Sequence, residues 1–239
     1  MAEVKISSAL KDNYEGYYEG EETEWRRLGA MAKAQNVVAL CQDLPNRTIL
    51  EIGAGDGAIL NRLSELNFGN EYYAVEISSS GLTALRNRRI PRVVESKLFD
   101  GYQIPYADHT FDIAILSHVV EHVEHPRQLL YEAARVARYI FLEVPLEDTS
   151  RLASDFVFDK VGHINHYSPR TIRWLVQSCN LRVLRQITTN PSKAIYTYKR
   201  GRLGLINYYV KQTLLNFAPS LATRIVAYHG SLVCERKSN

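Results

Sequence analysis

A glycine-rich stretch, GAGDG at Gly53–Gly57, joins a short apolar strand pattern to the beginning of a helix pattern. The strand pattern covers Thr48–Ile52, and the helix pattern continues through Leu66. Glycine permits tight turns and lets the backbone approach a bound ligand closely. A strand, a glycine loop and a helix in this order are typical of the first unit of a parallel α/β fold with a ligand at its edge. This stretch limits the possible folds more than any other.

Strand and helix patterns alternate along the rest of the chain. Strands are predicted at 48–52, 72–77, near 92–95, at 111–117, 139–144, 181–188 and 227–235, and helices at 24–44, from the glycine loop through 66, at 80–88, 126–138 and 168–180. Strands and helices of these lengths imply a parallel sheet with helices on both faces. We therefore predict an α/β fold, Rossmann-like and doubly wound. Its mostly parallel sheet has seven strands, and a helical insertion lies near the C-terminus.

The 239 residues contain neither an internal repeat nor a low-complexity linker, which favours a single domain. We divide it into an N-terminal arm and helix (1–44), a central core (45–190) and a helical cap with the last strand (191–239). In the cap, apolar residues recur near one helical face, namely Leu203, Ile206, Tyr209, Val210, Leu214 and Phe217. Such a face suits a packed cap, a homodimer through the 203–226 helix, or a helix that lies on a membrane surface.

Composition places the chain among ordinary globular proteins, with 46% hydrophobic and 23% charged residues. The net charge of +3 permits an anionic partner without requiring one. Three widely spaced cysteines form neither a disulfide framework nor a CxxC metal site, and they suit a reducing compartment. The N-terminus lacks an apolar signal segment, and no stretch is long and apolar enough to span a bilayer. These features predict a soluble, cytoplasmic protein without a transmembrane segment.

Carboxylates near the glycine loop indicate the charge of its ligand. Glu51 lies two residues before Gly53, and Asp56 lies within the loop. Both would repel a pyrophosphate on the helix N-terminus, whereas they would attract a sulfonium and an ammonium group. S-adenosylmethionine carries both groups and no phosphate. The pattern Gly53-x-Gly55-x-x-Ala58 also fits the dinucleotide fingerprint, so an NAD-dependent oxidoreductase is an alternative, although an unlikely one.

A further acid, Glu76, ends the second strand pattern in "YYAVEIS". An acid about twenty residues beyond such a glycine loop is placed to accept hydrogen bonds from ribose hydroxyls. We therefore predict that Glu76 binds the ribose of the cofactor.

Four stretches together resemble the successive core motifs of class I S-adenosylmethionine-dependent methyltransferases. They are "ILEIGAGDGAIL", "YYAVEIS", "FDGYQIPYADHTFDIAILSHVVEHV" and "YIFLEVP". The resemblance is closest to the branch with the ubiquinone and menaquinone methyltransferases, and it covers roughly residues 48–188. It implies that S-adenosylmethionine is the cofactor and S-adenosylhomocysteine the product.

The resemblance also implies roles for individual residues. Glu51 and the loop Gly53–Gly57, which includes Ala54, Gly55, Asp56 and Gly57, would face the methionine moiety. Glu76 and its neighbour Ile77 would lie at the ribose. Asp100 would reach the adenine amino group, with Gly101 or Tyr102 supplying backbone contacts, and Ser117 and His118 would line the sulfonium side.

The stretch from His118 to His122 reads H-x-x-E-H, the signature of the inverted zinc peptidases. In a peptidase the motif lies within a longer helix, whereas Pro126 interrupts this segment after two turns. The segment instead follows the strand pattern 111–117, at the edge where open α/β sheets bind ligands. A peptidase is therefore the disfavoured interpretation, and the histidines lie at the rim of a ligand site.

Four histidines are candidates for the chemistry of this site: His118, His122, His163 and His166. Three roles are open for them: orienting polar groups, a general base, or ligands of a divalent metal. The third role rests on a resemblance to the small-RNA 3′-end methyltransferases, in which a similar ExxEH and a downstream histidine bind a divalent ion. His118 replaces the first glutamate of that pattern, and a histidine suits magnesium less well. A metal is thus not the favoured interpretation.

Two histidines far apart in sequence should meet in space. His122 follows one predicted parallel strand and His163 follows the next, so both emerge at the same carboxyl edge of the sheet. We predict that the two side chains lie together on the acceptor side of the cofactor.

The methyl acceptor is predicted to be a small molecule, methylated at an O or N atom. The Asn/Asp-Pro-Pro-Tyr motif of adenine-N6 DNA methyltransferases is missing, and so is the Pro-Cys nucleophile pair of cytosine-C5 methylation. No aromatic-basic RNA module is recognisable, so a nucleic-acid acceptor is disfavoured without being excluded. An RNA or lipid-linked acceptor is the alternative. A non-catalytic binding protein would not need the acids Glu51, Glu76 and Asp100.

Overall fold

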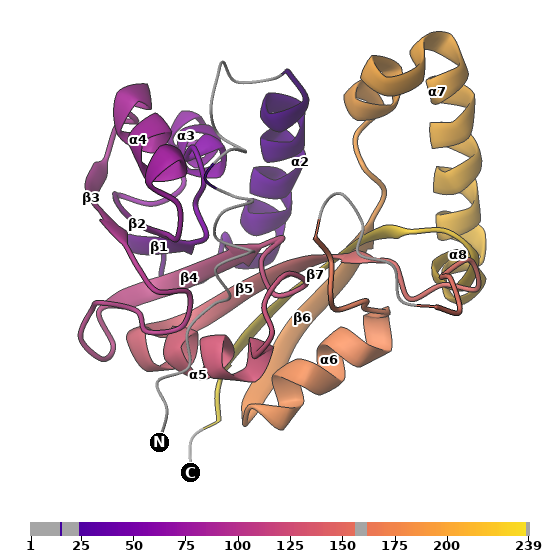
Figure 1. Ribbon diagram of the computed structural model, residues 1–239. Helices are drawn as coiled ribbons and strands as arrows, with labels where there is room; N and C mark the ends of the chain where they lie inside the picture. Colours follow the sequence, from indigo (N-terminus) through magenta and orange to yellow (C-terminus); the bar gives the residue numbers. More distant parts are fainter. Residues whose placement is uncertain (1–14, 16–23, 156–161, 238–239) are drawn as a thin grey trace.

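The computed structural model describes residue 15 and residues 24–155 and 162–237 (Figure 1). Within these ranges, seven strands form one sheet in the order β3-β2-β1-β4-β5-β7-β6. Their bounds are β1 Thr48–Ile52, β2 Glu71–Glu76, β3 Val93–Leu98, β4 Phe111–Ser117, β5 Ala137–Leu146, β6 Leu181–Thr189 and β7 Tyr228–Arg236. Strands β1 to β5 pair in parallel, and β7 runs antiparallel between β5 and β6. The predicted α/β fold with a mostly parallel seven-stranded sheet is confirmed.

Helices cover both faces of this sheet because its buried strands are apolar on both sides. On one face lie α2 Glu24–Cys41, α3 Ala58–Glu65 and α4 Ser79–Arg88, and on the other α5 Pro126–Val136 and α6 Pro169–Ser178 (Figure 1). Successive residues of a strand point to opposite faces of the sheet. Ile49 packs in the layer with α2, α3 and α4, and Leu50 packs in the layer with α5 and α6. The carboxyl ends of β1, β2, β4 and β5 therefore share one edge of a rigid core.

Several predicted boundaries were wrong by a few residues. The first helix ends at Cys41 rather than Leu44. Helix α5, the fourth in the predicted order, ends at Val136 rather than Arg138, because Ala137 already pairs with Phe111 and begins β5. The third strand extends to Leu98, since it pairs along the whole length of β2.

The cap between β6 and β7 consists of two helices, so the prediction of a single helix over 203–226 was wrong. Helix α7, Lys193–Phe217, bends at Arg200 and Gly201, and Gly201 has the positive φ of 55° that glycine accepts readily. Ala218 leaves the helical conformation, and Pro219 opens the short helix α8, Pro219–Ile225. Leu214, predicted on the same face as Phe217, instead packs against the core. None of the described helices is long and apolar enough to cross a membrane.

Helix α6 begins with a reciprocal cap. The Ser168 hydroxyl accepts a hydrogen bond from the Thr171 amide at 3.3 Å, and the Thr171 hydroxyl accepts one from the Ser168 amide at 2.8 Å. We expect Ser168→Ala to lower the free energy of unfolding by about 1 kcal/mol, because the amide then lacks its acceptor. Urea unfolding measures this, with Ser64→Ala in α3 as the control, which should change stability by less than about 0.5 kcal/mol. Equal midpoints for the two variants would contradict the capping role.

Candidate active site

The glycine loop between β1 and α3 needs glycine at three positions. Gly53, Gly55 and Gly57 have φ values of 72°, 53° and 74°, in the left-handed region that other residues avoid. A Cβ on Gly53 would lie 2.8 Å from a methyl carbon of Val119. The amides of Gly53 and Ala54 both donate to the Val75 carbonyl, at 2.9 and 3.2 Å. The sequence therefore folds here as a tight loop fastened to the end of β2.

Glu76 holds the centre of this loop. Its carboxylate accepts hydrogen bonds from the Gly55 amide at 2.8 Å and from the amide and hydroxyl of Ser78, each at 3.0 Å. Only 3% of its surface is exposed. Burial raises the pKa of Glu76, and these hydrogen bonds oppose that rise. Glu76 thus links the two loops that follow β1 and β2, and its role toward a ribose stays a prediction.

Glu51, the other predicted cofactor acid, is buried at the end of β1. Its Oε2 atom has no hydrogen-bond partner. Burial raises its pKa well above the usual value, while the ammonium of Lys33 opposes the rise. A cationic ligand placed here would meet a carboxyl oxygen with free hydrogen-bonding capacity, which agrees with the role predicted for Glu51.

Asp56 is engaged within the protein. Its Oδ2 atom lies 2.8 Å from the Arg88 guanidinium and 3.3 Å from Arg26, and its Oδ1 accepts from the Ala58 amide at 3.2 Å. From the sequence we predicted that this charge is available to a cationic ligand. Two arginines from α2 and α4 offset it instead, so the predicted attraction for a sulfonium group would rest on Glu51 more than on Asp56.

The loops after β2 and β3 hold the residues predicted near ribose and adenine. Asp100 Oδ1 accepts hydrogen bonds from the amides of Tyr102 and Gln103, at 2.9 and 2.6 Å, and so forms a turn. Gly101 is buried with φ 99°, which suits glycine. The half-buried Ile77 follows Glu76. These residues lie at the same carboxyl edge as the glycine loop, and their ligand contacts stay predictions.

His118 follows β4 in a strained conformation. Its φ is 59°, and its amide donates to the Glu143 carbonyl at 2.8 Å, beside the buried Ser117. The imidazole lies between two fully buried carboxylates: Nδ1 is 3.2 Å from Glu121 Oε1, and Nε2 is 3.6 Å from Glu143 Oε1. A positive φ is uncommon for a residue other than glycine and marks positions with a functional constraint.

The predicted meeting of His122 and His163 is confirmed, with ring centroids 4.8 Å apart and both side chains buried. His122 Nδ1 lies 3.1 Å from the Gly162 carbonyl, and His163 Nδ1 lies 2.8 Å from Glu147 Oε2. Burial lowers the pKa of His122, which favours its neutral form. His166 is half-buried, with Nδ1 3.7 Å from Glu147 Oε2. The segment that leads to Gly162 and His163, residues 156–161, lies outside the described part of the chain.

Glu121, His122 and His163 form a group that could hold a metal ion, since one ligand atom of each lies within 4.8 Å of the others. Both carboxyl oxygens of Glu121 are buried; neither accepts a hydrogen bond of good geometry, and Oε1 pairs with His118 Nδ1 at 3.2 Å. Although burial raises the pKa of Glu121, the nearby His118 and His122 outweigh it and keep the pKa low. The contacts of both Nδ1 atoms with Gly162 and Glu147 would orient the rings, as in many metal sites. The donors fit a divalent transition metal better than magnesium.

Three site residues were missed by the sequence analysis: Lys33, Glu143 and His229. Glu143 Oε2 accepts hydrogen bonds from Asn36 and Ser231, both at 2.7 Å, and Oε1 lies 3.7 Å from His229 Nδ1. Burial raises the pKa of Glu143, but His118, His229 and Lys33 outweigh this effect and hold that pKa well below the usual range. Burial lowers the pKa of His229 to about 3.

Two of the missed residues, Glu143 and Lys33, had local signals. Glu143 interrupts the apolar run "YIFLEVP", and a charge within a buried strand needs partners. Lys33 lies between Ala30 and Val37 on the buried face of α2, where a basic residue is unusual. Burial lowers the pKa of Lys33, and four acids oppose this: Glu143, Glu121, Glu51 and Asp56.

The fold and this edge are typical of proteins that bind an adenosine-containing cofactor, and comparison with known proteins specifies the class. A family model described as "Methyltransferase domain" matches residues 24–186. The chain therefore belongs to this methyltransferase-domain family.

Similar sequences carry little further detail. An uncharacterized methyltransferase of Mycolicibacterium gilvum is 31% identical over 116 residues, which are 45% of each chain. One from Mycobacterium tuberculosis strain H37Rv is 33% identical over 92 residues, 38% of this chain and 35% of that protein. The chain thus matches less than half of the length of these relatives.

Solved structures share the fold at low identity. Geranyl diphosphate C-methyltransferase from Streptomyces coelicolor A3(2) has a TM-score of 0.67 and 12% identity, over 97% of this chain and 100% of that one. A putative sarcosine dimethylglycine methyltransferase from Galdieria sulphuraria has a TM-score of 0.63 and 16% identity, over 95% and 98%. At these identities the likeness establishes the fold alone.

Proposed function

We propose that the protein transfers a methyl group from S-adenosylmethionine to an O or N atom of a small-molecule acceptor. The observation that carries the proposal is the convergence of Glu121, His122 and His163 beside His118, one strand away from the glycine loop. A cofactor over the ends of β1 and β2 would present its methyl group toward the end of β4. The acceptor would then enter from the side of the histidines.

The chemistry needs positioning more than activation, because the sulfonium cofactor supplies an already activated methyl group. Well-oriented reactants can gain about 7–11 kcal/mol of barrier lowering. In this proposal Glu51 attracts the cationic end of the cofactor and Glu76 holds its ribose. A neutral His122 or His163 accepts the proton of an acceptor hydroxyl or ammonium. If a divalent ion binds, Glu121, His122 and His163 hold it, and the ion supplies a polarising charge for an acceptor oxygen.

The acceptor class rests on the polar, histidine-lined side of the site. Solved proteins of this fold include enzymes named for small acceptors, such as a Haemonchus contortus phosphoethanolamine N-methyltransferase complexed with phosphomonomethylethanolamine. They show that the fold accommodates such acceptors and support our choice no further. Membership of the ubiquinone and menaquinone branch stays a prediction.

The first test is cofactor binding. We expect S-adenosylhomocysteine to raise the thermal midpoint, because a ligand that binds only the native state stabilises it by mass action. At a hundred times its dissociation constant the stabilisation is about 2.7 kcal/mol. Differential scanning fluorimetry measures the shift, with NADH at equal concentration as the control. A shift with NADH and none with S-adenosylhomocysteine would overturn the assignment.

The acceptor is found in a second experiment. Methyl-labelled S-adenosylmethionine is incubated with the protein and with separate metabolite, lipid and RNA fractions. We expect label in the metabolite fraction, and label confined to the RNA or lipid fraction would contradict the proposed acceptor class.

A further inference from the structure

The second part of α7, from Arg202 to Phe217, is anchored to the molecule by one face. The Lys211 ammonium donates to the Ala227 carbonyl at 2.7 Å, and the Tyr228 hydroxyl donates to the Lys211 carbonyl at 2.8 Å. The Asn190 side chain donates to the Tyr208 carbonyl at 3.2 Å. These contacts join α7 to the ends of β6 and β7 and fix which side of the helix faces outward.

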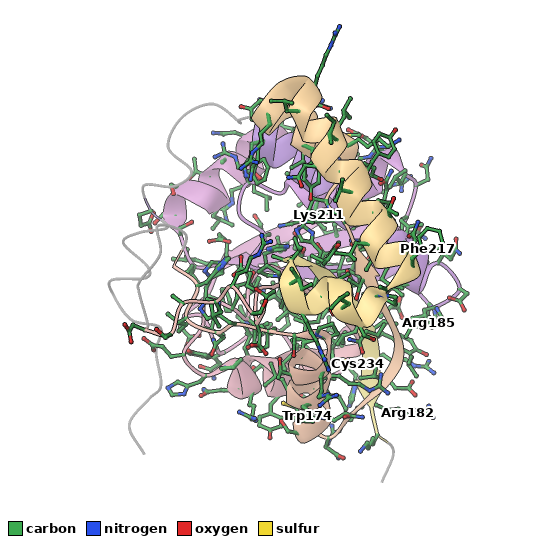
Figure 2. The ribbon with its side chains drawn as sticks, turned by 90° about the vertical axis from the view of Figure 1, so that its right-hand side faces the viewer. Trp174, Arg182, Arg185, Lys211, Phe217 and Cys234 are labelled. Carbon is green, nitrogen blue, oxygen red and sulfur yellow. The ribbon has the colours of Figure 1, made fainter. Side chains whose placement is uncertain are left out.

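The outward side of α7 is apolar. Leu203, Ile206, Val210 and Phe217 are 73%, 62%, 61% and 86% exposed, and their spacing places them on one helical stripe. Over fourteen residues this outer stripe extends about 21 Å. Leu221 of α8, 51% exposed, continues it. Figure 2 views the molecule from this side, with Phe217 close to the junction of α7 and α8. A continuous apolar surface of this kind marks an interaction site.

The same two helices carry only positive charge. Residues 162–234 include ten lysines and arginines and no aspartate or glutamate, although the whole chain has a net charge of only +3. The cations in α7 and α8 are Lys193, Lys199, Arg200, Arg202, Lys211 and Arg224. Within the described residues, none of these six side chains forms a salt bridge. Lys199 and Lys211 lie over aromatic rings, and Arg202 and Arg224 are exposed at the two ends of the outer stripe.

A second copy of this chain is a poor occupant for the surface, because pairing the two outer stripes would bring the cations of both copies together. An anionic lipid surface complements both features, since it accepts an apolar stripe at the headgroup boundary and attracts the flanking cations. We propose that α7 and α8 form a docking surface for anionic membranes, with α7 lying in the plane of the interface. This role does not depend on the identity of the methyl acceptor.

The test is co-sedimentation of the full chain with phosphatidylcholine vesicles and with mixed vesicles that also contain phosphatidylglycerol. We expect binding to the mixed vesicles, much weaker binding to phosphatidylcholine alone, and a decrease with added salt. The double variant Ile206→Ser/Phe217→Ser should bind at least about tenfold more weakly, because it removes two exposed apolar side chains that a bound membrane would bury. Arg202→Glu should weaken binding by about fivefold or more, the effect of one basic residue at such a surface.

Matched controls lie at distant positions. Val94→Ser replaces an exposed apolar residue of the edge strand β3, 58% exposed, and Arg47→Glu reverses an exposed arginine before β1. Both should bind mixed vesicles like the parent, and the thermal shift with S-adenosylhomocysteine verifies the fold of each variant. Failure of the parent to sediment with mixed vesicles would overturn the proposal, as would equal binding by Ile206→Ser/Phe217→Ser. A parent dimer in analytical ultracentrifugation that Phe217→Ser dissociates would assign the surface to a second copy instead.

Discussion

Replacing His163 or His122 by alanine should lower turnover by about 10²-fold or more, while the affinity for S-adenosylmethionine changes little. A positioned acid or base contributes about 10²–10⁴-fold to a rate. Both imidazoles are buried in one cluster beyond the glycine loop, so their removal affects the acceptor more than the cofactor. Single-turnover methyl transfer, together with calorimetric titration of the cofactor, separates the two effects.

His109→Ala is the matched control, because His109 is exposed in the turn before β4, at the opposite edge of the sheet. It should have parental turnover. A chelator distinguishes the two chemical roles in the parent protein. If chelation abolishes activity and a divalent ion restores it, the histidines hold a metal. If chelation has no effect while the alanine variants are slow, they act as a base or orient the acceptor. Full activity after both treatments would leave the histidines as structural polar groups.

Replacing Glu76 by alanine should weaken cofactor binding about tenfold to a hundredfold. A hydrogen bond to a charged acceptor contributes about 1.5–3 kcal/mol, and the proposed contact joins the Glu76 carboxylate to the ribose hydroxyls. Calorimetric titration with S-adenosylhomocysteine measures the change. Glu71→Ala is the control, because Glu71 is a less buried acid on the same strand. This variant should have unchanged affinity.

The structure shows that replacing Glu76 should also destabilise the free protein, which the sequence does not reveal. Glu76 accepts hydrogen bonds from the Gly55 amide and from Ser78, so alanine leaves buried donors without partners. We therefore expect Glu76→Ala to lower the thermal midpoint of the free protein as well. An unchanged dissociation constant would show that Glu76 organises the loop without holding the ribose.

Local patterns were sufficient to predict the sheet and the position of the glycine loop. Strands β1 and β4 were predicted to the residue, because their apolar runs are bounded by clear polar or glycine signals. The proximity of His122 and His163 followed from topology, since the loops that follow parallel strands lie at the same edge of the sheet. These features depend on residues close in sequence or on a rule of connection.

Features that depend on distant partners could not be predicted in this way. Asp56 looked available to a ligand because Arg26 and Arg88, which neutralise it, lie about thirty residues away on either side. Glu143 gained a role only when β7 brought Ser231 and His229 beside it. The register of β7 against β5 determines that meeting, and no local pattern encodes it.

The position of β7 has a consequence for the order in which the chain acquires its structure during synthesis. Strand β7, which follows the other six strands in the sequence, occupies the position between β5 and β6, and both of these are made before it. Until Tyr228–Arg236 emerges, both of those strands have an unpaired edge, and such edges can pair with other chains. Until then the Glu143 carboxylate also lacks the hydrogen bond that it accepts from the Ser231 hydroxyl. The interior of this edge of the sheet is thus completed only after β7 has been made.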